Sequence, residues 1–339
     1  MFKITKKITV IALIISFVIV VLLTLFTAVM RVYFYSPASE KGDNRTIIIK
    51  EGMHLKEISI MLESEGLIKN AMAFRLLAKI KGCGSMLKAG EYNFNPNMIP
   101  GRIMEMLTRG EIIAHTATIP EGFSIEQIAD VLSSNGLVDR EKFLLYTKKD
   151  GVEKNYGIEG PGLEGYLYPD TYHIARGLDA KSIADIMVKR FREITDPFDN
   201  RIAETGMTLH EVITLASIVE KETGKADERP IIASVFHNRL RKHMRLESDP
   251  TVIYGIENFS GNLTKKDLNN YSPYNTYVIR GLPPGPIANP GLDSIKAVLY
   301  PAETNYLYFV SKNDGSHYFS SSLKEHNKAV YQYQKKKKK

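Results

Sequence analysis

One acidic side chain lies on the apolar face of a helix that is easily recognised in the sequence. Residues 208–224 (TLHEVITLASIVEKETG) open with a Thr208–Glu211 capping box and end at Gly224, the expected C′ residue. At about 100° per residue, the apolar side chains fall on one stripe, formed by Leu209, Val212, Ile213, Ala216 and Val219. Glu220 lies inside that stripe, about 20° from Leu209 by the same count. An ionised carboxylate facing a core is costly, so this group is paired, protonated or lining a cleft.

A protonated carboxyl is the group that general-acid cleavage of a glycosidic bond requires. A low-dielectric surround and the negative end of the helix dipole both favour that form in the last turn of a helix. The structural alternative is a core glutamate paired with a buried cation, for which Arg239 and Arg280 are the candidates. The pattern alone leaves both interpretations open.

The N-terminal segment predicts a single membrane-spanning helix. Residues 8–30 carry no formal charge and would measure about 34 Å as a helix, against roughly 30 Å of hydrocarbon. A cleaved signal peptide is the alternative, but its shorter apolar region and A-x-A-like site are absent. Lys3, Lys6 and Lys7 precede the segment and Arg31 follows it, which places residues 1–7 in the cytoplasm. We therefore expect an uncleaved cell-membrane anchor with the rest of the chain outside.

The charge distribution argues against a nucleic-acid partner. The formal net charge is +7, but four positive charges lie in residues 1–31 and five in the tail 335–339. Residues 32–334 then carry −2, so no basic face is expected on the folded part. We interpret the lysine tail as disordered, with attraction to anionic lipid or wall polymer as the alternative.

The exported part begins with an internal repeat after a polar linker at residues 31–45. Eight residues from Ile49 to Leu67 recur 70 positions later, from Ile119 to Leu137. Each copy predicts a short strand, a turn at Glu-Gly and a helix that ends at a glycine. The first copy continues with a helical stretch at 70–81 and a strand at 89–94, and this order resembles a LysM module. A small positioning domain without sugar contacts is the alternative.

The second half of the chain predicts a mixed α+β domain. Residues 306–311 and 317–321 flank an Asp314–Gly315 turn and predict a hairpin, and Ser322 with Glu325 caps a final helix. We therefore expect an α+β fold class throughout. The expected domains are the anchor at 8–30, a LysM-like domain at 46–155 and a catalytic domain at 156–334.

A series of short motifs runs through residues 160–330 in a fixed order. They are LEGYLYPDTY (163–172), ASIVEKE (216–222), VFHNRL (235–240), LESDPTVIYG (246–255), SPYNTY (272–277), GLPPGPIANPG (281–291), YLYFV (306–310) and HYFSSSLKEHN (317–327). This series resembles the YceG-like endolytic murein transglycosylases. The sequence departs from the family pattern at Glu247, where Gln is common, and at Ser322, where Thr is usual.

The resemblance implies that Glu220 is the catalytic acid/base. The implied reaction cleaves the β-1,4 bond between N-acetylmuramic acid and N-acetylglucosamine within a glycan strand and leaves a 1,6-anhydromuramyl end, which would terminate strand elongation. The substrate supplies its own nucleophile, so one carboxyl serves both proton transfers. The implied partners are peptidoglycan glycan strands and peptidoglycan synthases.

Other polar residues of these motifs are candidates for binding the sugar chain or supporting the site, although each could be structural. They are Asn238, Ser248, Asp249, Thr251, Tyr254, Tyr274, Asn275, Tyr277, Asn289, Glu325 and Asn327. Two other functions stay open: a hydrolytic muramidase in which Glu220 is paired with Asp249 or Glu247, and a non-catalytic wall-binding scaffold. Metallopeptidase and serine-hydrolase motifs are absent, so no metal or cofactor is expected.

Overall fold

The computed structural model describes residues 2–257 and 259–335, and the chain divides into two compact units. Unit 1 runs to His115 and adds the segment Ala175–Asp179, whereas unit 2 holds the rest of the described chain. Residues 336–339 of the predicted lysine tail lie outside the described residues. The division falls between the two copies of the repeat, so the domain boundary at 155/156 stays a prediction.

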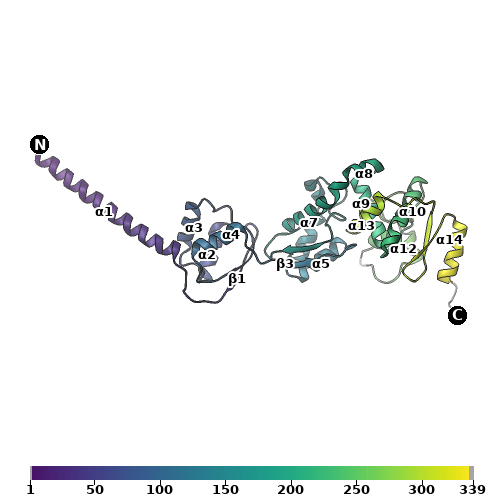
Figure 1. Ribbon diagram of the computed structural model, residues 1–339, viewed down its shortest axis with the longest axis horizontal. Coiled ribbons are helices and arrows are strands. Elements are labelled where there is room, and N and C mark those ends of the chain that lie inside the picture. The colour runs from purple at the N-terminus through teal and green to yellow at the C-terminus, as the bar shows by residue number, and fades with distance from the viewer. Residues whose placement is uncertain (1, 258, 336–339) are drawn as a thin grey trace. The chain divides into compact units, whose positions relative to one another are not determined.

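The N-terminal apolar segment forms one long helix, α1 (Phe2–Tyr35), shown in Figure 1. Its part from Leu13 to Tyr35 is long and apolar enough to cross a membrane, with a mean hydropathy of 2.9 and none of it buried within the structure. This range overlaps the predicted span at 8–30. The structure is therefore consistent with a single-pass anchor.

Unit 1 pairs two strands and packs three short helices around them. The elements are β1 (Arg45–Ile49), α2 (Leu55–Ser64), α3 (Ala71–Ile80), β2 (Gly90–Phe94) and α4 (Pro100–Arg109). The strands are antiparallel, with Ile47 opposite Tyr92. The predicted order of strand, helix, helix and strand is confirmed, whereas the likeness to a LysM module stays a prediction.

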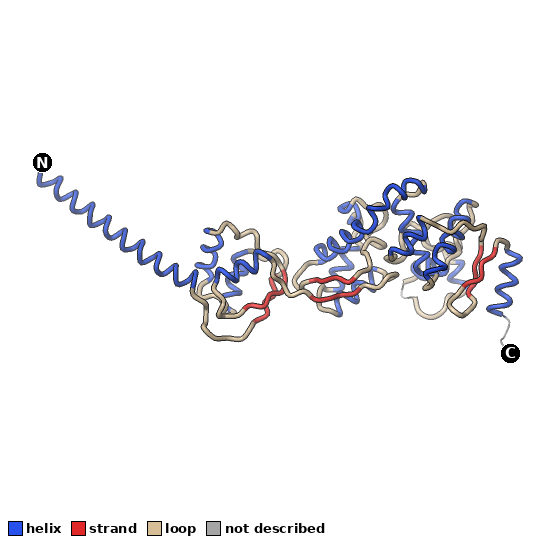
Figure 2. Tube along the Cα trace, viewed as in Figure 1, coloured by secondary structure: helices blue, strands red, loops and turns tan. Residues whose placement is uncertain are grey.

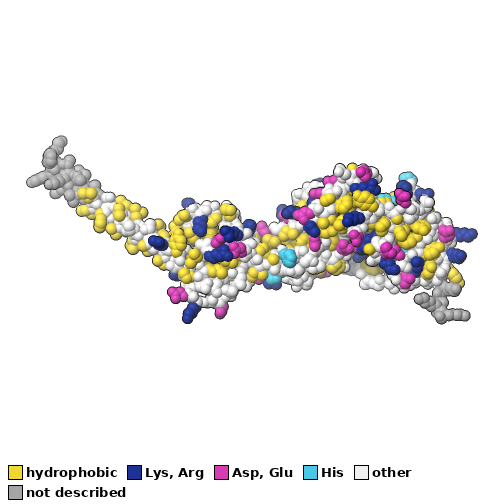
Figure 3. Space-filling model, in the orientation of Figure 1, with side chains coloured by type: hydrophobic (Ala, Val, Ile, Leu, Met, Phe, Trp, Pro, Cys, Tyr) yellow, Lys and Arg dark blue, Asp and Glu magenta, His cyan; other side chains and the backbone are white. Residues whose placement is uncertain are grey.

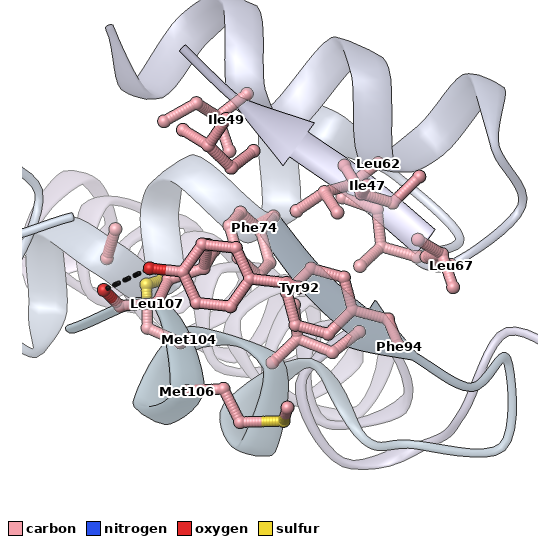
Figure 4. Packing of buried hydrophobic residues seen from close by; sticks show 14 of the residues in the cluster. Ile47, Ile49, Leu62, Leu67, Phe74, Tyr92, Phe94, Met104, Met106 and Leu107 are labelled. Carbon is pink, nitrogen blue, oxygen red and sulfur yellow. Dashed lines mark hydrogen bonds between the residues drawn. The ribbon is translucent and has the colours of Figure 1, made fainter. Parts of the chain in front are cut away.

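The core of unit 1 forms between these helices and strands (Figure 4). Tyr92 and Phe94 point to the same side of β2, and their rings stack with centroids 5.4 Å apart. The Tyr92 hydroxyl donates to the Lys88 carbonyl at 2.8 Å, so the one polar atom of this buried ring has an acceptor. The other large core residues are apolar and include Ile49, Leu62, Phe74 and Leu107.

The two copies of the repeat adopt the same backbone conformations. The turn glycines Gly52 and Gly122 have φ of 82° and 75°, and the helix-ending glycines Gly66 and Gly136 have φ of 62° and 65°. After each helix, the N–H of the residue that follows the glycine donates to the carbonyl five residues earlier. The Leu67 N–H donates to Leu62 O at 2.9 Å, and the Leu137 N–H donates to Leu132 O at 3.0 Å. The predicted glycine caps are therefore confirmed.

Unit 2 is mostly helical, with two of the three two-stranded sheets of the described chain (Figure 2). Its strands are β3 (His115–Thr118), β4 (Thr171–Ile174), β5 (Tyr308–Ser311) and β6 (His317–Ser320), and the predicted β5–β6 hairpin is confirmed as antiparallel. The α-helices are α5 (Ile125–Ser134), α6 (Arg140–Thr147), α7 (Ala180–Thr195), α8 (Asp199–Thr205), α9 (Leu209–Glu222), α10 (Arg229–Arg241), α11 (Asp249–Tyr254), α12 (Lys265–Asn269), α13 (Leu292–Leu299) and α14 (Leu323–Val330). Four further short helical turns are η1 (Val152–Tyr156), η2 (Asp196–Phe198), η3 (Ala226–Glu228) and η4 (Tyr331–Lys335). The α+β class is confirmed.

Helix α9 lies at the centre of unit 2, packed against both α10 and α13. It begins at the predicted Thr208–Glu211 capping box. Its end differs from the expectation, because Gly224 follows the C-cap Thr223 but does not have a positive φ. The chain instead leaves the helix in an extended conformation at Thr223, so no left-handed glycine cap forms.

Gly66 and Gly136 have the same backbone conformation, so replacing either glycine should lower the stability of the protein by the same amount. Gly66→Ala and Gly136→Ala should each lower the free energy of unfolding by about 1 to 2 kcal/mol, because an L side chain is strained at a left-handed φ. Gly101→Ala, within α4 and without a positive φ, is the control and should be neutral or slightly stabilising. Urea unfolding of the full chain in detergent measures this. Equal stability of all three variants would contradict it.

Candidate active site

Glu220 lies in the last turn of α9 with its side chain turned into unit 2. The neighbouring Val212, Ile213, Ala216 and Val219 are fully buried, and the Glu220 side chain is only 7% exposed. The expectation of an acid on the apolar face is therefore confirmed. The carboxyl needs hydrogen-bond partners at this depth.

Two donors hold the Glu220 carboxyl. The backbone N–H of Gly291 donates to Oε2 at 3.0 Å, and Arg229 Nη2 lies 3.4 Å from Oε1. Gly291 is the N-cap of α13, and Arg229 is the first residue of α10 with a side chain only 11% exposed. Glu220 thus meets a helix N-terminus and one cation, both of which suit a carboxylate.

The structural alternative named Arg239 and Arg280 as candidate cations for Glu220, and the structure places Arg229 there instead. The Arg239 side chain is buried and donates to the carbonyls of residues 245, 246 and 307 and to Glu247 Oε2 at 3.0 Å. Arg280 is exposed and lines a separate cavity of about 310 Å³ with Met244. Arg229 is the cation that pairs with Glu220, because α10 starts beside the end of α9. Helical periodicity does not predict how the chain turns between these two helices.

A second carboxylate shares Arg229 with Glu220. Glu121 Oε2 lies 4.0 Å from Arg229 Nη2, and the Glu121 side chain is 48% exposed. A Cβ on Gly291 would collide with the Glu121 carboxylate, so this carboxylate lies against the same glycine that binds Glu220. Partial burial raises the pKa of the Glu121 carboxyl, and the negative charge of Glu220 adds to this rise while Arg229 opposes it.

The loops that carry Glu121 and Gly291 are joined by Asn289, which is fully buried. Gly122 N–H donates to the Asn289 carbonyl, and Asn289 N–H donates to the Phe123 carbonyl, both at 2.9 Å. The Asn289 side chain donates to Phe123 O and Glu164 Oε1 and accepts from Leu167 N–H. This predicted binding residue therefore has every polar side-chain atom engaged within the protein.

Glu164, in the motif LEGYLYPDTY, is a buried acid that the sequence analysis did not select. It accepts hydrogen bonds from the Ile125 N–H, the Asn289 amide and the Tyr254 hydroxyl. Burial raises the pKa of Glu164 to about 8, against the opposing effect of the Ile125 and Tyr254 hydrogen bonds. Glu164 thus holds the side chain of Asn289, which joins the loops that carry Glu121 and Gly291.

Glu222 is a further acid, partly buried, two residues after Glu220 on α9. Ser248 Oγ donates to Glu222 Oε1, and burial raises the pKa of Glu222 to about 7. Ser248 N–H donates to Thr276 Oγ1 at 3.0 Å, and Thr276 Oγ1 lies 2.8 Å from Thr251 Oγ1. The first turn of α11 and its N-cap thus hold three of the predicted residues, namely Ser248, Asp249 and Thr251.

The other predicted residues lie at several places in unit 2. The Tyr277 hydroxyl donates to Asp249 Oδ1 at 2.7 Å, and the Tyr254 and Tyr274 rings lie 4.8 Å apart. Asn275 is buried and donates to three carbonyls of residues 267–270. In the part of the chain that the structure describes, none of the eleven predicted side chains hydrogen-bonds to Glu220.

Asn238 lies on the wall of a cavity, whereas Glu325 and Asn327 lie on the exposed face of α14. The cavity measures about 530 Å³, and Ser234, His237 and Arg241 line it. The Asn238 amide donates to the carbonyls of Thr304 and Tyr306, both at 2.9 Å, so it holds the chain before β5. Among the described residues, no group of three or more His, Cys, Asp or Glu is placed to hold a metal ion.

Fold and site together define an α+β protein built around a buried acid, and the comparisons identify its family. The YceG-like family model matches residues 47–332. An endolytic murein transglycosylase of Bacillus subtilis (strain 168) is 36% identical over 87% of this chain and 86% of the relative. A Streptococcus pneumoniae serotype 2 protein of the same name is 31% identical over 85% of this chain and 58% of the relative. A crystal structure of a YceG-like protein from Listeria monocytogenes matches with a TM-score of 0.60 and 36% identity, over 85% of this chain and 100% of that one.

The chain therefore belongs to the YceG-like family, which confirms the resemblance seen in the motifs. Glu121, Arg229, Glu164 and Glu222 were not among the predicted site residues. A signal for Glu121 was present in the sequence, since it is the glutamate of the repeated Glu-Gly turn.

The shared arginine predicts non-additive stability effects. Arg229→Met should lower the free energy of unfolding by about 3 kcal/mol, because it leaves two carboxylates without their cation. Adding Glu121→Gln should recover part of this loss, since it removes the like-charge repulsion. Arg109→Met, which breaks an exposed pair with Glu105, is the control and should cost less than about 1 kcal/mol. Strict additivity in urea unfolding would show that Glu121 and Arg229 are not coupled.

The raised pKa of Glu164 predicts a pH dependence. Between its ordinary value of 4.5 and about 8, the folded state holds a proton that the unfolded state has released. The free energy of unfolding should therefore fall as pH rises through this window, by at most about 1.4 kcal/mol per pH unit. Glu164→Gln should reduce this slope, and the exposed Glu204→Gln should not. Urea unfolding between pH 5 and pH 8 compares the pH dependence of the free energy of unfolding in the parent and both variants. An unchanged dependence in Glu164→Gln would show that Glu164 does not hold the proton.

Proposed function

We propose that this protein is an endolytic murein transglycosylase, with Glu220 as its catalytic acid/base. The relatives of Bacillus subtilis and Streptococcus pneumoniae carry that name. The observation that carries the role of Glu220 is the burial of its carboxyl beside the apolar side chains of α9. Gly291 N–H and Arg229 favour the carboxylate form, which the second proton transfer needs. The substrate is peptidoglycan, and the enzyme is a lyase rather than a hydrolase.

The proposed reaction uses one carboxyl twice. Glu220 first gives a proton to the glycosidic oxygen as the β-1,4 bond between N-acetylmuramic acid and N-acetylglucosamine breaks. The resulting carboxylate then takes the proton of the muramyl 6-hydroxyl as that oxygen closes on C1, giving the 1,6-anhydro end. Arg229 and the Gly291 N–H stabilise the carboxylate between the two steps, because their charge and dipole face its oxygens.

A hydrolytic muramidase is the second candidate, because the structure brings a second carboxylate to the site. Glu121 shares Arg229 with Glu220 and is half exposed, so it is the group that would activate a water molecule. The partners considered from the sequence are engaged elsewhere, Asp249 with Tyr277 and Glu247 with Arg239. We favour the transglycosylase because the related proteins are named for that reaction.

We further propose how the chain is placed in the cell. Helix α1 anchors it in the cell membrane with residues 1–7 in the cytoplasm, so that the chain after α1 lies on the cell-wall side. The LysM-like domain holds the glycan strand and the catalytic domain cuts it, next to the synthases that extend it, which terminates elongation. The predicted contact residues that reach the surface are the proposed sugar ligands: Asp249, Tyr254, Tyr274, Tyr277, Glu325 and Asn327.

Replacing the catalytic acid tests this proposal. Glu220→Gln keeps the shape of the side chain but has no proton to give, so glycan cleavage should fall at least about 100-fold. Glu204→Gln, on the surface of α8, is the matched control and should cleave at the parent rate. Digestion of purified glycan strands, followed by chromatography of the fragments, measures both.

Glu222→Gln distinguishes the roles of the two neighbouring acids at the end of α9. It should retain cleavage well above that of Glu220→Gln, provided that circular dichroism shows both variants folded. Full activity in folded Glu220→Gln would reject the proposed role, and its loss only in Glu222→Gln would assign the acid to Glu222. If the parent protein and the Glu204→Gln control are both folded but neither cleaves glycan strands, the assignment as an enzyme is rejected.

A further inference from the structure

Helix α3 in unit 1 has two apolar faces. Phe74, Leu77 and Ala78 are buried in the core. On the opposite side, Met72, Leu76 and Ile80 are spaced four residues apart, and Met72 and Ile80 are 70% and 65% exposed. Residues four apart lie on one face of a helix, so these three form an outer stripe.

The outer stripe lies next to α1. Leu76 and Ile80 line a groove of about 640 Å³ with residues of α1 from Phe26 to Tyr35, including Met30 and Phe34. Both helices belong to unit 1 and pack against each other. Figure 3 shows hydrophobic side chains along α1 and on the part of unit 1 that it joins. The groove therefore lies at the outer end of the candidate membrane span Leu13–Tyr35.

The segment of the chain that contains α3 carries charges of one sign. Residues 66–90 contain Lys69, Arg75, Lys79, Lys81 and Lys88 and no Asp or Glu. Lys69, Lys79 and Lys81 are exposed. An apolar stripe bordered by lysine and arginine is the pattern of a helix that lies in the membrane interface, with its apolar side chains among acyl chains and its cations at the headgroups.

We propose that α3 lies along the outer surface of the membrane and binds anionic lipid, so that unit 1 rests on the bilayer instead of standing away from it. This rests on the proposed anchoring by α1. The occupant of the outer stripe is lipid, because the stripe continues an apolar surface that already belongs to the membrane span and because its basic border complements anionic headgroups. Unit 1 would then hold glycan strands close to the membrane surface.

Tryptophan fluorescence in nanodiscs tests the proposal, since the chain has no tryptophan of its own. The probes are single substitutions at exposed apolar positions, in the full chain, in nanodiscs of phosphatidylcholine and phosphatidylglycerol with brominated acyl chains. Met72→Trp and Ile80→Trp report the two ends of the stripe, about 12 Å apart along the helix. Ile60→Trp, at an exposed position of α2 beside acidic residues, is the matched control, and Leu22→Trp reports insertion of α1.

Bromolipid should quench Leu22→Trp, Met72→Trp and Ile80→Trp by at least twofold, and Ile60→Trp far less. Replacing phosphatidylglycerol with phosphatidylcholine should weaken the quenching of Met72→Trp but not of Leu22→Trp. Quenching of Ile80→Trp without Met72→Trp would mean that α3 only touches the anchor, and equal quenching of Met72→Trp and Ile60→Trp would mean that no face is selected; both overturn the proposal. Loss of quenching at Leu22→Trp would reject the anchor itself, independently of glycan cleavage.

Discussion

The arrangement of the site depends on the contact between the end of one helix and the start of another. The Glu220 carboxyl, in the last turn of α9, accepts the N–H of Gly291, the N-cap of α13. A helix N-terminus leaves backbone donors without partners inside the helix, and its dipole favours a negative charge. One buried carboxylate and one helix start therefore satisfy each other. Gly291 is suited to this position because any side chain there would collide with the Glu121 carboxylate.

This contact holds only while three distant segments stay together. The Glu-Gly turn of the second repeat copy, the motif that contains Glu164 and the proline-rich loop before α13 meet at Asn289. The amide of Asn289 has no polar atom left for a ligand, because both its nitrogen and its oxygen are hydrogen-bonded. Glu164 accepts hydrogen bonds from three donors, the Ile125 N–H, the Asn289 amide and the Tyr254 hydroxyl. The buried side chains of Asn289 and Glu164 that join these segments are thus hydrogen-bonded, which is the condition under which buried polar groups specify one structure.

The sequence predicted the local features of this fold well. The capping box at Thr208 and the glycine caps at Gly66 and Gly136 depend on neighbouring residues, so their spacing was sufficient. The buried side of Glu220 was also predicted, because helical periodicity fixes which face a residue occupies. The end of α9 was not, since Gly224 has the right residue type but the chain turns away in an extended conformation.

The partners of Glu220 could not be predicted from spacing. Arg229 depends on how the chain turns between α9 and α10, and Glu121 lies 99 residues before Glu220 in the sequence. The amide side chains show the same limit. Asn238, Asn275 and Asn289 were candidates for binding sugar because they stand in polar motifs, yet each donates to backbone carbonyls. A sequence shows that an amide is present, whereas only the fold shows what it bonds to.

The central claim is that Glu220 transfers protons while the substrate provides the attacking oxygen, and isotope labelling tests it most directly. Intact glycan strands are digested in water enriched in ¹⁸O, and the fragments are weighed by mass spectrometry. The account predicts fragments with 1,6-anhydromuramyl ends and no ¹⁸O at C1. Reducing muramyl ends that carry ¹⁸O would contradict it, because the attacking oxygen would then have come from the solvent.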